Sequence, residues 1–134
     1  MKTINEIQKI IIEIGKIINS PKELLTVFNS PQPDGTPYIN TNNNQYHYII
    51  EERGNIFQKK STDSLDLLIY WIVSDIVFDI SVEYELNHRK ENKDSRRLIF
   101  EHELHLFKKI NNAWYEKRKK EIEITLINAP YEDI

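Results

Sequence analysis

Three carboxylates recur at intervals of four residues near the middle of the chain: Asp75, Asp79 and Glu83. On a helix this spacing places the three side chains on one face. Carboxylates so arranged can carry out acid–base catalysis, or hold Mg²⁺ together with substrate phosphates. Both roles need further polar groups close by, and the neighbouring residues are mostly apolar. Three interpretations of the row therefore stay open: structural ion pairing, an acidic stripe that faces a partner, and catalysis.

Arginines that can pair with acids follow this row in the sequence. The planar guanidinium group can hold two carboxylate oxygens at once, which suits it to ion pairs inside a fold. We expect the arginines to lie near acids of the central helix or near Glu85, and Asp94 to cap the helix that follows it. The predicted structural ion pairs involve Glu85, Arg89, Asp94, Arg96 and Arg97.

The histidines and glycines do not form a known catalytic motif. His102 and His105 are three residues apart, whereas a zinc protease helix needs histidines at i and i+4. The chain has no cysteine, which excludes thiolate ligands and cysteine nucleophiles. Its three glycines are too widely spaced for a phosphate-binding loop. We therefore predict no catalytic residue, no metal site and no cofactor, and we interpret His102 and His105 as solvated helix residues.

The charge distribution singles out one segment. The formal net charge is −3, which disfavours nucleic acid as a partner because phosphate binding needs a basic surface. Residues 61–86 contain six acids and no lysine or arginine. Such a segment would steer a basic partner to those acids that are exposed. The predicted binding residues are Asp63, Asp66, Asp75, Asp79 and Glu83.

The elements that position these residues predict an α+β fold. Helical spacing of isoleucines near the N-terminus indicates a first helix, and short alternating runs at residues 36–41, 45–52 and 55–61 indicate a three-stranded antiparallel sheet. A long central helix over 64–87 and two further helices over 95–110 and 113–127 follow. The central helix is apolar on several sides and should be covered by other elements, so the sequence leaves open whether Asp75 and Asp79 are buried or exposed.

Residues 1–134 are expected to form a single domain. The N-terminus lacks the apolar stretch of a secretory signal, and no apolar run approaches the ~20 residues that span a bilayer. The sequence therefore predicts a cytoplasmic protein without a membrane partner.

Several short phrases occur together in a characteristic order. They are Tyr46-His47-Tyr48, Glu52-Arg53-Gly54, Thr62-Asp63, Leu67-Leu68-Ile69-Tyr70-Trp71-Ile72, Tyr84-Glu85-Leu86 with Arg89, Asp94 with Arg96-Arg97 and Phe100, and Pro130-Tyr131 with Asp133. In this order and spacing the chain, from about residue 36 to its C-terminus, resembles the immunity protein 63 family of bacterial polymorphic-toxin systems. The resemblance implies an inhibitor that binds a cognate toxin domain and protects the producing cell or its kin. It implies no catalytic residues.

Two rival functions stay open at the level of sequence. One is a regulatory or interaction domain with a partner unrelated to toxins, and the other is a metal-dependent enzyme. A large toxin gene immediately upstream would distinguish immunity from the first rival. Metal analysis of the purified protein would test the second.

Overall fold

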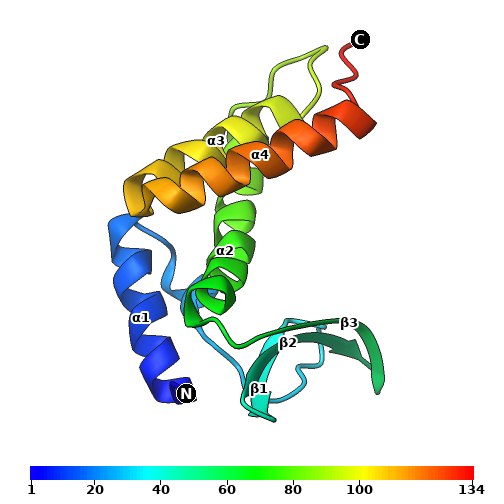
Figure 1. Ribbon diagram of the computed structural model, residues 1–134. Coiled ribbons are helices and arrows are strands. Elements are labelled where there is room, and N and C mark those ends of the chain that lie inside the picture. Colours follow the sequence, from blue (N-terminus) through cyan, green and yellow to red (C-terminus); the bar gives the residue numbers. More distant parts are fainter. The chain divides into compact units, whose positions relative to one another are not determined.

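The protein, described over residues 1–134 by a computed structural model, begins with a helix and continues through a sheet to three further helices (Figure 1). The elements are α1 (Ile4–Ile17), the 3-10 helix η1 (Lys22–Leu25), β1 (Tyr38–Asn42), β2 (Gln45–Glu52), β3 (Asn55–Thr62), α2 (Leu65–Asn87), α3 (Arg96–Ile110) and α4 (Asn112–Asn128). This order confirms the predicted α+β fold. The chain divides into two compact units, Met1–Val73 and Ser74–Ile134, and α2 contributes residues to both. That the two units form a single domain stays a prediction.

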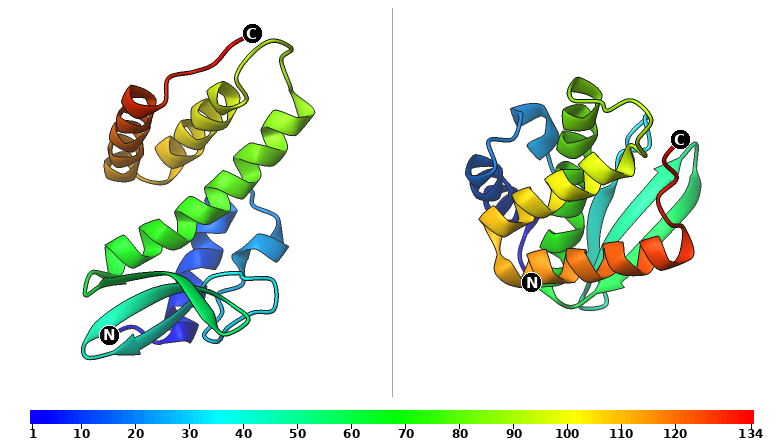
Figure 2. Two further views of the ribbon diagram at one scale, coloured as in Figure 1. Left: turned by 90° about the vertical axis from the view of Figure 1, so that its right-hand side faces the viewer. Right: turned by 90° about the horizontal axis from the view of Figure 1, so that it is seen from above.

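The sheet in the first unit is an antiparallel meander in the order β1–β2–β3 (Figure 2). Arg53 and Gly54, between β2 and β3, both have positive φ, at 51° and 79°. Positive φ at both central residues is the geometry of the type I′ hairpin turn, and its twist matches that of the flanking strands. Asn43 and Asn44 make the corresponding turn between β1 and β2, with φ of 49° and 59°. Both turns fall in the gaps between the strands that the sequence predicts over 36–41, 45–52 and 55–61.

The central strand β2 is buried on both faces. Its residues 46–49 are all buried, as the apolar residues in both of its alternating rows predict. His47 is part of this core, and its two ring nitrogens each lie 2.6 Å from a polar oxygen, Ser61 Oγ and Asn42 Oδ1. His47 is thus a hydrogen-bonded core residue.

Helix α1 packs on η1 through a close approach at Gly15. The Thr3–Glu6 capping box begins the helix as predicted. A Cβ atom at Gly15 would lie only 2.6 Å from Cδ1 of Leu25. Glycine, which weakens a helix on its own, here leaves the space that Leu25 occupies.

Helix α2 begins slightly later than the sequence suggests. The predicted helix covers 64–87, whereas Ser64 is the capping residue, because its Oγ accepts a hydrogen bond from Leu67 N at 3.1 Å. Asp63 precedes the cap and is exposed.

Helices α3 and α4 of the second unit form an antiparallel hairpin (Figures 1 and 2). Asn111 ends α3 with an extended backbone and begins α4, since its Oδ1 accepts from Trp114 N at 3.1 Å. The predicted break at Asn111-Asn112 is confirmed. Glu103 on α3 accepts a hydrogen bond from Arg118 Nη2 on α4 at 2.9 Å, and both side chains are largely buried. No helix combines the length and apolar character needed to cross a membrane.

Candidate functional site

The strongest candidate site is the acidic surface of α2. This helix contains five acids and neither lysine nor arginine. All five acids predicted to bind a partner are exposed: Asp63, just before the helix, and Asp66, Asp75, Asp79 and Glu83 within it. The sequence left the burial of Asp75 and Asp79 open, and the structure shows both exposed. The helix is apolar on several sides, but the strip that carries these two acids faces solvent.

Apolar side chains lie beside the acids on the same face. Phe78 and Leu86 are 46% and 55% exposed, and Val82 between them is half-buried. The central helix was expected to be covered by other elements, and the exposure of Phe78 corrects that expectation for this strip. Because Phe78, Val82 and Leu86 are also four residues apart, they form an apolar row parallel to the row Asp75, Asp79 and Glu83. We call these six residues the mixed face of α2.

Like charges meet within the acidic row. Partial desolvation raises the pKa of the Asp79 carboxyl above its ordinary value, and the negative charge of Asp75 raises it further. The charge of Asp75, one helical turn away, therefore disfavours ionisation of Asp79. A cation placed over the row would relieve this repulsion.

The sixth acid of segment 61–86 faces away from solvent. Glu85 is 3% exposed, and its two carboxylate oxygens accept hydrogen bonds from Arg89 Nε at 3.1 Å and Arg89 Nη2 at 2.9 Å. The pair spans one helical turn, from Glu85 in α2 to Arg89 just after it. A partner at the surface would meet the other five acids rather than Glu85.

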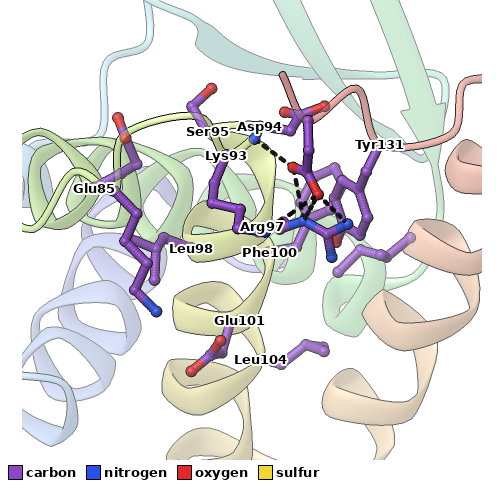
Figure 3. Close-up of a pocket in the computed structure, with 13 residues that line it drawn as sticks. Glu85, Lys93, Asp94, Ser95, Arg97, Leu98, Phe100, Glu101, Leu104 and Tyr131 are labelled. Carbon is purple, nitrogen blue, oxygen red and sulfur yellow. Dashed lines mark hydrogen bonds and ion pairs between the residues drawn. The ribbon is translucent and has the colours of Figure 1, made fainter.

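The remaining predicted ion-pair residues gather at the start of α3. Asp94 Oδ1 accepts from Arg96 N at 2.9 Å, and the Arg96 guanidinium donates to the same carboxylate, at 2.8 Å from Nη2 to Oδ2. Arg97 Nη2 donates to Asp133 Oδ2 at 2.8 Å (Figure 3). We name as the C-terminal clamp the four residues Asp94, Arg96, Arg97 and Asp133. Arg96 and Arg97 thus pair beside the chain's C-terminus rather than with the acids of α2, because both lie on the first turn of α3, where the C-terminal segment returns.

The clamp fixes the last residues of the chain onto α3. Arg96 also donates to the carbonyl oxygens of Ala129 and Pro130, each at 2.9 Å. The Arg97 guanidinium carbon lies 4.1 Å from the centre of the Tyr131 ring, a cation–π contact. The Arg97 hydrogen bonds, followed by that from Asp94 N, lower the pKa of Asp133 to about 2. The bonds from Arg96 hold the pKa of Asp94 well below its ordinary value.

A pocket of about 640 Å³ opens next to the clamp (Figure 3). Leu98, Phe100 and Leu104 supply apolar walls, and Glu85 and Arg97 are among the charged groups that line it. Both of these charges already have partners, in Arg89 and Asp133. These two ion pairs at the pocket link Glu85 to Arg89, just after the end of α2, and Arg97 to the C-terminal segment.

Tyr84 and His102 line a second pocket, of about 530 Å³, and belong to a stack of three rings. The Tyr84 ring lies between His88 and His102, with centroids 4.1 Å and 4.0 Å away and nearly parallel planes. His102 is therefore half-buried rather than fully solvated, and desolvation lowers its pKa. No group of three histidine, aspartate or glutamate side chains is arranged to hold a metal ion.

Sequence reasoning missed several of these residues. The sequence does not predict the exposure of Phe78 and Leu86. Each lies three residues after an acid of the row, but that spacing alone does not show which residues face solvent. Asp133 is too far along the chain from Arg97 for spacing to pair them. Glu103 looks like an ordinary surface acid, and nothing in the sequence indicates that it is buried against Arg118.

Comparison with known protein families gives one match. The model of the family described as Immunity protein 63 matches residues 42–124, which is more than half of the chain and confirms the resemblance seen in the sequence. The match contains β2, β3, α2 and α3 in full, and so the whole mixed face. Asp133 of the clamp lies outside the matched residues. No curated protein and no solved structure matches the chain significantly.

Proposed function

Because the chain belongs to the immunity protein 63 family, we propose that it binds a cognate bacterial toxin domain and neutralises it by direct stoichiometric contact. Catalysis plays no part in this proposal. The producing cell, or its kin, is thereby protected. The observation that carries the proposal is the family match, which covers the acidic surface of α2.

The exposed acids support binding to a basic protein surface. Charge complementarity speeds the encounter of two proteins, and a few desolvated anchors slow their separation. The proposed contact residues include the exposed acids Asp63, Asp66, Asp75, Asp79 and Glu83. The same negative surface repels nucleic acid and anionic membranes, so we propose a protein as the partner and the cytoplasm as the place of action.

Co-expression tests this function directly. The toxin gene beside this one is placed under tight control in a sensitive host, with and without the immunity gene. We expect cells that make both proteins to survive and cells that make the toxin alone to die. An unrelated toxin serves as the specificity control and should kill in both cases. Equal killing by the cognate toxin in both strains would point to a different partner and end the immunity hypothesis.

Stoichiometry separates binding from enzymatic inactivation. Purified toxin domain is titrated with the immunity protein, and its residual activity and intact mass are recorded. Direct binding predicts loss of activity that is complete near one equivalent, with no change in the mass of the toxin. Complete inactivation by a small fraction of an equivalent, or a changed toxin mass, would show a catalytic mechanism instead.

A further inference from the structure

We propose that the toxin domain docks on the mixed face of α2, with Phe78 and Leu86 as apolar anchors and the row Asp75, Asp79 and Glu83 as the complement to a basic surface. This inference rests on the proposed function and specifies which surface performs it. It also specifies the partner's chemistry: cationic side chains that border an apolar depression.

The geometry of a helix places the two rows in contact with one another. Phe78 follows Asp75 by three residues, Val82 follows Asp79 by three, and Leu86 follows Glu83 by three. Residues at this spacing are neighbours on the helix surface. A partner that fills the space over the apolar row must therefore also lie beside the acids, where water is excluded and charge pairing becomes stronger.

The exposed apolar groups are unusual for a helix turned to solvent. Phe78 and Leu86 are about half exposed, although most residues of the apolar remainder of α2 are buried. Anchors of this kind, surrounded by polar groups, resemble the aromatic centre and polar rim of protein interfaces. Burying the exposed part of an aromatic ring contributes binding free energy, and the acids around it set which partner can approach.

Charge excludes the other occupants of this face. A second copy of the chain on this face would bring two acidic rows into one interface, and their like charges would disfavour association. An anionic membrane surface would be repelled in the same way. A basic protein surface is the one partner that both rows favour.

The mixed face contains only three of the five exposed acids. Asp63 and Asp66 lie in the first unit, nine or more residues before Asp75, and are not part of the four-residue ladder. An exposed aromatic side chain is also present elsewhere, because Phe57 on β3 is 66% exposed. Lys59 and Lys60 follow it on the same strand, so a basic partner is not favoured there. Phe57→Ala is therefore the matched control for Phe78→Ala.

The test measures association and dissociation rates with the purified toxin domain encoded by the neighbouring gene as the probe. One variant carries Asp75→Asn, Asp79→Asn and Glu83→Gln. Its control carries Glu116→Gln, Glu123→Gln and Glu132→Gln, which removes the same charge, so both change the formal net charge from −3 to 0 (−3 + 3). We expect the first to slow association about tenfold at low ionic strength, with the difference shrinking toward 1 M salt, and the control to stay within about twofold.

The apolar row should act on dissociation instead. Phe78→Ala is expected to speed dissociation by about 30-fold, the size typical of an interface anchor, whereas Phe57→Ala should change it by less than about twofold. Far-UV circular dichroism and thermal melting of every variant show whether it is folded, and Leu86→Ser replaces Phe78→Ala if the latter unfolds.

The outcomes separate the two levels of the proposal. If the wild-type protein neither binds nor protects, the proposed function fails, and with it the proposed toxin-binding surface. If it binds but the mixed-face variants behave like their controls, the function stands and this surface is wrong. A larger effect of Phe57→Ala than of Phe78→Ala would move the interface to the sheet. A wild-type dimer that Phe78→Ala converts to a monomer would assign the face to a second copy and overturn the inference.

Discussion

At the scale of single residues, the C-terminal clamp shows how few contacts fix the end of the chain. Asp133 accepts hydrogen bonds from the Arg97 guanidinium and from Asp94 N, the latter at 2.8 Å. Asp94 in turn accepts from Glu132 N at 2.9 Å. Two carboxylates thus each bridge the start of α3 and the C-terminal segment. Both need to be ionised to accept these bonds fully.

We predict that the stability conferred by Asp133 depends on pH. Its pKa is lowered from the ordinary value of 3.8 to about 2, so its contribution is fully present above pH 3.8 and is lost as the pH falls toward 2. Asp133→Asn should therefore lower the free energy of unfolding at pH 7, and its difference from wild type should shrink below pH 4. Urea unfolding across this range measures both. The control is Glu132→Gln, because the Glu132 side chain is not bonded to either arginine, and an equal loss in that variant would contradict the assignment.

His102 provides a second prediction at this scale. Desolvation, followed by the charges of His105, Lys109 and His88, lowers its pKa below the ordinary value of 6.5. An NMR titration should find a midpoint below 6.5 for His102. The unfolded chain then binds a proton more readily than the folded protein, so His102 makes the free energy of unfolding fall as the pH drops below 6.5. Tyr84→Leu, which removes the ring stacked on His102, should return the midpoint toward 6.5, and a wild-type midpoint at or above that value would contradict the prediction.

At the scale of elements, the α3–α4 hairpin depends on a buried ion pair. Glu103 is 2% exposed, and burial raises the pKa of its carboxyl, while the hydrogen bond from Arg118 opposes that rise. The Arg118 guanidinium carbon also lies 5.5 Å from the centre of the Phe100 ring. A buried charge without its partner is far less favourable than either an intact pair or an apolar replacement.

We therefore predict that Arg118→Met destabilises the protein by about 3–5 kcal/mol. The double variant Glu103→Leu/Arg118→Met should recover most of that loss, because no unpaired charge is left in the core. Chemical denaturation measures both. Lys119→Met, a neighbouring exposed lysine on α4, should change stability by less than about 0.5 kcal/mol. If the double variant is no more stable than the single one, the pair itself contributes the stability, and the desolvation argument is wrong.

Helix α2 combines two roles that its composition alone does not separate. Val73 and Val77 are fully buried, while Asp75 and Phe78, close to them along the chain, are exposed. The helix thus provides core residues on one side and the mixed face on the other. Substitutions on these two sides should have different effects, on stability for the first and on toxin binding for the second.

At the scale of the whole molecule, α2 is the covalent and structural link between the two compact units. Residues 65–73 belong to the first unit and residues 74–87 to the second. Melting either unit alone would require breaking a continuous helix in its middle, which loses backbone hydrogen bonds on both sides. We propose on this ground that residues 1–134 unfold as one domain.

Calorimetry tests this proposal. A single domain predicts one thermal transition with equal calorimetric and van't Hoff enthalpies. Arg118→Met, whose effect lies in the second unit, should lower the melting temperature of that single transition without splitting it. Two transitions, of which only one shifts in Arg118→Met, would show that the units unfold independently.

The sequence by itself determined the elements, their order and the family. Helix periodicity, the Thr3–Glu6 capping box, the Arg53-Gly54 turn and the Asn111 break are local signals, because each depends on contacts between residues close in the chain. The i,i+4 pairing of Glu85 with Arg89 is likewise within reach of sequence reasoning. The excess of acids in segment 61–86 is found by counting the charged residues of the sequence.

Only the tertiary structure decided which of these groups are exposed and which are paired at long range. The apolar character of α2 on several sides predicts that other elements cover the helix, but hydrophobicity does not specify which strip stays exposed, and here it is the strip with Asp75 and Phe78. Arg97 meets Asp133, and Arg118 meets Glu103, through the return of the chain in space. Burial and long-range pairing depend on how separate elements pack, and the periodicity of a single element contains no information about its neighbours.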